Sequence, residues 1–206
     1  SDRGRFEDAV AFYSDAAASL PNRVDIYYRR GICYENLNLL PKALEDYSMC
    51  LEVQSQHLDA LNNKGVVLAK LERYQEAAEV FTDLLRYQPN NVLALRNRGL
   101  CQHDQGKFDE ALADYAAAVA MAPHEAESWF QRGNVYLETR RLAEAEVDYA
   151  RAIELDAGHA KAWMNRGVGR YNAGERKLAM QYLERASKLD ENIIIPGIDW
   201  EELAPT

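Results

Sequence analysis

A spacing of 34 residues runs through this chain of 206 residues and constrains its fold more than any other feature. Glycines recur at this spacing, and alanines follow each of them after twelve residues; they are Gly31, Gly65, Gly99, Gly133 and Gly167, with Ala43, Ala77, Ala111, Ala145 and Ala179. Large side chains keep the same step at Tyr13, Tyr47, Phe81, Tyr115, Tyr149 and Leu183. A fixed period of this length indicates a repeat architecture, in which each unit stacks on its neighbours.

Each unit also carries the pattern of amphipathic helices, with apolar residues at steps of three and four. One such segment has Phe108, Ala111, Leu112, Tyr115, Ala118 and Val119. Pro89 and Pro123 stand where two helices are expected to have ended, because proline lacks the N–H and fixes φ. The sequence therefore predicts an all-α fold of paired helices, in which the recurring Gly and Ala allow close approach.

These positions resemble the tetratricopeptide repeat, a 34-residue pair of antiparallel helices with the signature W-x2-L-G-x2-Y, then Ala, an aromatic, Ala and Pro. The fourth unit matches best, with Trp129, Gly133, Tyr136, Ala145, Tyr149 and Ala152. The resemblance covers nearly all of the chain. It implies a right-handed α-solenoid, an α–α superhelix of tetratricopeptide helix pairs.

The repeat frame predicts five full units at 24–57, 58–91, 92–125, 126–159 and 160–193. Residues 1–23 match only the second helix of a unit. Either a longer parent protein continues upstream, which we favour, or a partner or a second copy covers this face. Residues 194–206 break the period and form a tail or cap. One interpretation has Ile193–Ile198 and Trp200 covering the last apolar face, and the other has this acidic tail occupying a groove of its own or a neighbouring molecule.

The residue before each recurring glycine departs from the family, which usually has leucine there. Here it is basic, and aspartate follows sixteen residues later in three units. We therefore predict ion pairs between the two helices of a unit, and we expect them to specify helix pairing more than net stability. The predicted pairs are Arg30–Asp46, Arg98–Asp114 and Arg132–Asp148.

The resemblance implies that the first helix of each unit lines a concave groove, with the sixth residue of the unit facing it. Four successive carboxamides at this position can pair with the N–H and C=O of an extended peptide. This is similar to the asparagine ladder in the repeat domain of O-linked N-acetylglucosamine transferase. The competing interpretation is a solvated surface. The predicted peptide-binding residues are Arg29, Asn63, Asn97, Gln131 and Asn165, with Arg96, Phe130, Asn134, Lys161 and Met164.

The family's carboxylate clamp, which holds the C-termini of Hsp70 and Hsp90, is not predicted. It needs lysine, asparagine and arginine at set positions of three successive units, and no window of this chain supplies them. The best window has Leu100 in place of the first asparagine, and Asn165 in place of the last arginine.

Composition and motifs exclude other classes of function. A formal net charge of −9 opposes binding to nucleic acid and to anionic membranes, and no apolar run is long enough to insert into a bilayer. Cys33, Cys50 and Cys101 lack a CxxC spacing, which suggests buried thiols in a reducing compartment. Histidines with metal spacing, phosphate loops and a nucleophile elbow are absent from the sequence, so no catalytic residue, metal or cofactor is expected.

We predict a non-enzymatic scaffold for protein–protein interaction that binds an extended peptide in the groove. Cytoplasmic localisation is expected, with the periplasm or an organelle left open. Two alternatives stay open as well. One is a structural subunit that packs side-on in a multiprotein assembly. The other is a homo-oligomer formed through the N-terminal face or the C-terminal tail.

Overall fold

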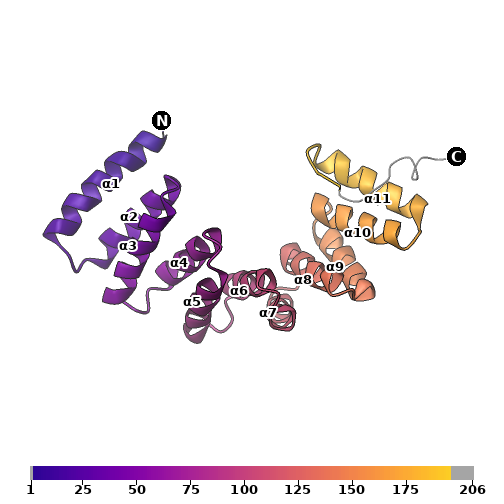
Figure 1. Cartoon of the computed structure of the whole chain (residues 1–206), viewed down its shortest axis with the longest axis horizontal. Helices are drawn as coiled ribbons and strands as arrows, with labels where there is room; N and C mark the ends of the chain where they lie inside the picture. The colour runs from indigo at the N-terminus through magenta and orange to yellow at the C-terminus, as the bar shows by residue number, and fades with distance from the viewer. Residues whose placement is uncertain (1, 196–206) are drawn as a thin grey trace. The chain divides into compact units, whose positions relative to one another are not determined.

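The computed structural model describes residues 2–195, which contain eleven α-helices and no strand within that range (Figure 1). This confirms the predicted all-α fold. The helices are α1 (Asp2–Ser19), α2 (Val24–Asn36), α3 (Leu40–Val53), α4 (Leu58–Lys70), α5 (Tyr74–Tyr87), α6 (Val92–Asp104), α7 (Phe108–Met121), α8 (Ala126–Glu138), α9 (Leu142–Leu155), α10 (Ala160–Asn172) and α11 (Arg176–Leu189).

The helix bounds repeat with the period of the sequence. The even-numbered helices begin at residues 24, 58, 92, 126 and 160, and the odd-numbered helices after α1 begin at 40, 74, 108, 142 and 176. Both series advance by 34 residues, so the repeated sequence builds a repeated pair of helices. We call α2, α4, α6, α8 and α10 the first helices, and their partners the second helices.

The described residues divide into two compact units, an N-terminal unit that ends at Glu110 and a C-terminal unit that begins at Ala111. In the N-terminal unit, each helix from α1 to α5 packs against the next one along the chain. In the C-terminal unit, α8 packs on α9, α9 on α10 and α10 on α11. Packing between consecutive helices is what a solenoid requires, because no single pair can bury its apolar face alone.

The recurring glycines lie against the large side chain sixteen residues later. A Cβ atom built on Gly31 would lie 2.7 Å from the Tyr47 ring, and one on Gly133 would lie 2.8 Å from the Tyr149 ring. Carbon atoms prefer separations of about 3.5–4.0 Å. Even an alanine would therefore displace the ring. The same contact joins Gly65 to Phe81 and Gly167 to Leu183.

Two of the predicted ion pairs are confirmed. The guanidinium of Arg30 donates to both carboxylate oxygens of Asp46, at 2.8 and 2.7 Å. Arg132 does the same to Asp148, at 2.7 and 2.8 Å. Both aspartates are buried, so these bidentate bonds compensate the cost of removing a carboxylate from water. Arg98 and Asp114 fall in different units, and their pairing stays a prediction.

The turn after each first helix uses a left-handed residue. These residues are Asn38, Glu72, Gly106, Arg140 and Gly174, with φ between 58° and 80°. In the second of these turns, Arg73 N–H donates to the carbonyl of Leu68 and Glu72 N–H donates to that of Ala69, both at 2.9 Å. This is the Schellman arrangement, in which glycine avoids the strain that a side chain imposes.

The cysteines are all free and buried. Burial raises the pKa of the Cys50 and Cys101 thiols to about 11, because the thiolate would lose its hydration. Only residues 194 and 195 of the tail are described. Ile194 is exposed, whereas Ile195 packs against Ala179 and Leu183. The predictions for Ile198, Trp200 and the rest of the tail fall outside the described residues.

We expect Gly133→Ala to lower the free energy of unfolding by about 1–2 kcal/mol, because the added methyl group overpacks the Tyr149 contact. This is the net effect after the gain of about 1 kcal/mol in helix propensity. Urea denaturation measures it. The matched control is Gly169→Ala in α10, whose added Cβ meets nothing within 4 Å, and which should stabilise the chain. Equal stability of the two variants would contradict the proposed contact.

Arg140→Gly is expected to raise the free energy of unfolding by about 1 kcal/mol, because glycine adopts the left-handed conformation without a Cβ clash. Gly174→Ala, at the equivalent turn, should lower it by a similar amount. Thermal melting of both variants beside the parent chain measures these effects. A destabilised Arg140→Gly variant would show that the arginine side chain contributes more than its backbone strain costs.

At pH 8 the Cys50 and Cys101 thiols should react with Ellman's reagent about 100-fold more slowly than free cysteine, because a pKa near 11 leaves little thiolate. The folded chain keeps these protons between pH 9 and 11, while the unfolded chain loses them. Their contribution to stability is therefore complete below pH 9 and is lost as the pH rises to 11. Fast labelling of the native chain would instead show that these helices open readily.

Candidate functional site

The predicted groove residues all lie on first helices, which hold them at equivalent places. The carboxamides Asn63, Asn97, Gln131 and Asn165 are half-buried, as are Arg96, Asn134 and Met164. Arg29 on α2 and Lys161 on α10 are exposed. The first-helix surface therefore carries amide groups that are partly removed from water, with charged side chains beside them.

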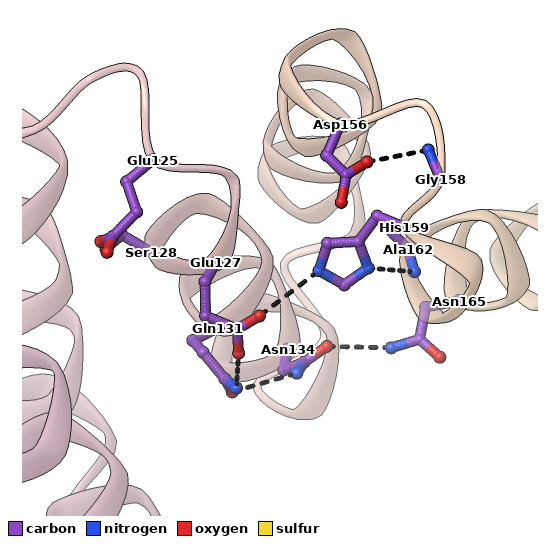
Figure 2. A network of polar contacts seen from close by, with 10 residues as sticks. All are labelled: Glu125, Glu127, Ser128, Gln131, Asn134, Asp156, Gly158, His159, Ala162 and Asn165. Carbon is purple, nitrogen blue, oxygen red and sulfur yellow. Dashed lines mark hydrogen bonds and ion pairs between the residues drawn. The ribbon is translucent and has the colours of Figure 1, made fainter.

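A chain of hydrogen bonds connects three of these amides in the C-terminal unit (Figure 2). Gln131 Nε2 donates to Glu127 Oε1 at 2.5 Å, and Asn134 Nδ2 donates to Gln131 Oε1 at 3.4 Å. Asn165 Nδ2 donates to Asn134 Oδ1 at 2.9 Å and so links α10 to α8. Asn134 thus connects the first helices α8 and α10.

Tyr149 supports this network from the second helix α9. Its hydroxyl donates to Asn134 Oδ1 at 3.0 Å and lies 3.4 Å from the amide nitrogen of Asn165, which donates to it. Burial raises the pKa of Tyr149 well above its usual range, and the hydrogen bond from Asn165 only partly opposes this. The phenol therefore stays neutral and keeps its proton for Asn134.

His159 links Glu127, at one end of this network, to the start of α10. Its Nδ1 accepts a hydrogen bond from the Ala162 N–H at 3.3 Å, which caps α10, and its Nε2 lies 3.4 Å from Glu127 Oε2. Its ring centroid lies 4.5 Å from that of Phe130. Figure 2 shows the imidazole between the two helices, so one side chain joins the cap of α10 to the amide chain on α8.

The N-terminal unit repeats the bond between amide and phenol. Asn63 Nδ2 donates to the Tyr47 hydroxyl at 3.4 Å, and that hydroxyl donates to Glu35 Oε2 at 3.1 Å. Lys70 binds the other oxygen of Glu35 at 2.7 Å. Asn63, like Asn165, therefore already donates a hydrogen bond to the tyrosine hydroxyl of the preceding unit.

Asn97 differs because the equivalent residue of its preceding unit is Phe81, which has no hydroxyl. Within the described part of the chain, no hydrogen bond involves the Asn97 side chain. Its two donor hydrogens and its acceptor oxygen are therefore available to a ligand. Of the four predicted ladder positions, Asn97 is the amide least committed to internal contacts.

Each unit also holds an apolar pocket beside a ladder amide. In the N-terminal unit, a pocket of about 290 Å³ between α4, α5 and α6 is lined by Asn97 with Ala69, Tyr74, Phe81 and Leu100. In the C-terminal unit, a pocket of about 390 Å³ between α8, α9 and α10 is lined by Asn165 with Leu137, Leu142 and Tyr149. Their walls correspond by two repeat lengths: Ala69 to Leu137, Tyr74 to Leu142, Phe81 to Tyr149 and Asn97 to Asn165.

Two predicted groove residues lie in packed surroundings. Phe130 is only 6% exposed and packs in a core cluster with Tyr149, so the structure places it inside the helix pair rather than on the surface. Met164 packs against Ala179 and Leu183. Phe130 and Met164 each stand directly before a ladder amide in the sequence. Their place on the helix did not predict that these large apolar side chains turn inward.

Sequence reasoning missed the side chains that organise the amides. These are the tyrosine hydroxyls, the Glu127–His159 link and the pocket walls Leu137 and Leu142. One signal was available. The large residue at the 34-residue step is tyrosine except at Phe81 and Leu183, and only tyrosine can hydrogen-bond to the next amide.

Over residues 2–195, no group of three His, Cys, Asp or Glu side chains gathers as metal ligands would. None of the helices in this range combines the length and apolar character needed to cross a bilayer.

Comparison with protein families identifies the repeats. Models of the tetratricopeptide repeat match residues 24–57, 51–85, 62–126, 104–160 and 130–192. A curated relative, Hsp70-Hsp90 organizing protein 3 of Arabidopsis thaliana, is 39% identical over 49 residues, which are 24% of this chain and 9% of that protein. The chain therefore matches only a small part of that relative's length.

Solved structures share the fold over most of the chain. YrrB, described as a tetratricopeptide repeat protein with an unusual peptide-binding site, is 26% identical, with a TM-score of 0.69 over 87% of this chain and 93% of its own. PilW, a type IV pilus biogenesis factor, has 21% identity and a TM-score of 0.78 over 93% and 89%. MamA of Desulfovibrio magneticus RS-1 has 22% identity and a TM-score of 0.76 over 82% and 95%.

Proposed function

The chain belongs to the tetratricopeptide repeat family, whose repeats serve as scaffolds for protein–protein interaction, and on that premise we propose that its first-helix surface binds an extended segment of a partner protein. Main-chain groups of the segment pair with the ladder amides, and its side chains enter the adjoining pockets. This division gives affinity from the main chain and specificity from the pockets.

The environment of the Asn97 side chain is the main support for this proposal. Its carboxamide carries no hydrogen bond within residues 2–195, and it lines the 290 Å³ apolar pocket of the N-terminal unit. A carboxamide can donate to a peptide C=O and accept from a peptide N–H at once. A half-buried amide beside an apolar wall is therefore suited to hold the main chain while a side chain is buried.

The N–H groups of the other ladder amides must exchange internal bonds for ligand bonds. Asn63 and Asn165 each donate to a tyrosine hydroxyl, and Gln131 donates to Glu127. Their net contribution to binding is therefore smaller than that of Asn97. Exposed Arg29 and Lys161, with half-buried Arg96 and Asn134, complete the proposed contact surface. The 26% identity with YrrB supports peptide binding as the mode of interaction.

Selection from a random peptide library displayed on phage, with the full chain as bait, tests the proposal. For a selected peptide, fluorescence anisotropy should show that Asn97→Ala weakens binding about tenfold, as expected for the loss of two hydrogen bonds. Asn165→Ala should weaken it less. Circular dichroism establishes that the variants remain folded.

The matched control is Gln181→Ala, which removes an exposed carboxamide from the second helix α11. It should leave the affinity unchanged. If Asn97→Ala binds the selected peptides as tightly as the parent chain, the ladder does not hold the main chain. If Gln181→Ala loses as much affinity as Asn97→Ala, binding lies outside the first-helix surface.

A further inference from the structure

The pocket of the C-terminal unit, here named the α9–α10 pocket, combines apolar walls with one polar edge. Leu137, Leu142, Ala143 and Ala145 line the apolar side, and Leu142 is half exposed at 50%. Asn165, Arg166 and Arg170 from α10 and Glu146 from α9 supply the polar edge. Its volume of about 390 Å³ falls in the range of about 300–1,000 Å³ typical of ligand pockets.

The charges at this edge balance one another. Arg166 Nε and Arg170 Nη2 both donate to Glu146 Oε1, at 2.8 and 2.6 Å. Arg170 Nη1 also donates to both oxygens of Glu175, at 2.8 and 3.0 Å. Two guanidinium groups therefore face two carboxylates. A ligand carboxylate would add an unbalanced negative charge beside Glu146 and Glu175, whereas a neutral polar group would not.

The pocket edge nevertheless keeps one donor group and one acceptor atom for a ligand. In the C-terminal unit as described, the Nη atoms of Arg166 donate no hydrogen bond, although its guanidinium carbon lies 4.6 Å from the centroid of the Tyr182 ring. The Oδ1 atom of Asn165 likewise accepts none, because its amide nitrogen makes the bonds to Asn134 and Tyr149. Figure 2 shows the oxygen of Asn165 turned away from Asn134.

A neutral group with one N–H and one C=O beside an apolar side chain is a residue inside a peptide. We infer that the α9–α10 pocket binds a bulky aliphatic or aromatic residue from within an extended segment. The side chain fills the pocket, the residue's N–H donates to Asn165 Oδ1, and its C=O accepts from the Arg166 guanidinium. This inference rests on the proposed function, and it names an internal apolar residue, rather than a free C-terminus, as the group recognised.

N-acetyl-leucine amide is the probe, because it is one apolar residue with a peptide group on each side. In a titration of the ¹⁵N-labelled full chain, we expect saturable shifts of the Asn165 side-chain amide and the Arg166 Nε–H signals. N-acetyl-glycine amide should bind at least about tenfold more weakly, because it buries no side chain. N-acetyl-leucine with its free carboxylate should also bind more weakly. No saturable shift, or equal affinity for the free acid, would overturn the inference.

Filling the pocket provides the matched variant. Ala143 lines the pocket and is exposed, so Ala143→Trp occupies the space without entering the core, and it should abolish binding of the probe. Ala120→Trp, at an exposed position of α7 outside the lining, is the control and should bind normally. Thermal melting shows that both variants fold. Unchanged binding in Ala143→Trp would place the probe elsewhere and would also overturn the inference.

The two proposals fail separately. The probe needs neither Asn97 nor a selected peptide, whereas the phage experiment depends on Asn97 in the N-terminal unit. If the probe does not bind but selected peptides still depend on Asn97, only the assignment of the α9–α10 pocket is wrong. If the probe binds but Asn97→Ala does not weaken binding of the selected peptides, the pocket assignment holds and the proposed role of the ladder amides is wrong.

Discussion

The contact between a recurring glycine and the large side chain sixteen residues later sets the distance between the two helices of a unit. At Gly31, Gly65, Gly133 and Gly167, a Cβ atom would lie 2.7 or 2.8 Å from that side chain. The helix backbone itself therefore forms the wall against which the ring packs. Because packed interiors transmit changes of a single methyl group, the positions of the first-helix amides depend on this contact.

The alignment of the two helices in a unit is determined by a second contact, an ion pair between residues that are also sixteen positions apart. Arg30 and Arg132 each hold a buried aspartate by two hydrogen bonds. A pair of this kind adds little net stability, but a slipped helix would leave a buried carboxylate without a partner, which is costly. The glycine sets how close the helices lie, and the ion pair sets which turns face each other. In the last unit, Tyr182 stands at the position of the aspartate. Arg166 there forms an ion pair with Glu146 and lies over the Tyr182 ring.

The same large side chain decides how each amide behaves. A tyrosine at this position uses its hydroxyl to hold the amide of the next first helix, as Tyr47 holds Asn63 and Tyr149 holds Asn165. A phenylalanine buries the same ring and leaves the amide unbound, as Phe81 does for Asn97. One oxygen atom thus separates a structural amide from one available to a partner, and the packing of the helix pair hardly changes.

The sequence by itself determined the helices, their 34-residue period, the glycine positions and two of the ion pairs. These features arise within one helix pair, where a fixed separation along the chain corresponds to a fixed separation in space. Only the tertiary structure decided that Phe130 lies in the core, that Asn134 connects Gln131 to Asn165, and that apolar pockets adjoin Asn97 and Asn165. Those features arise where three helices meet, and their geometry depends on rotamers and on the angle between successive pairs, which residue spacing does not encode.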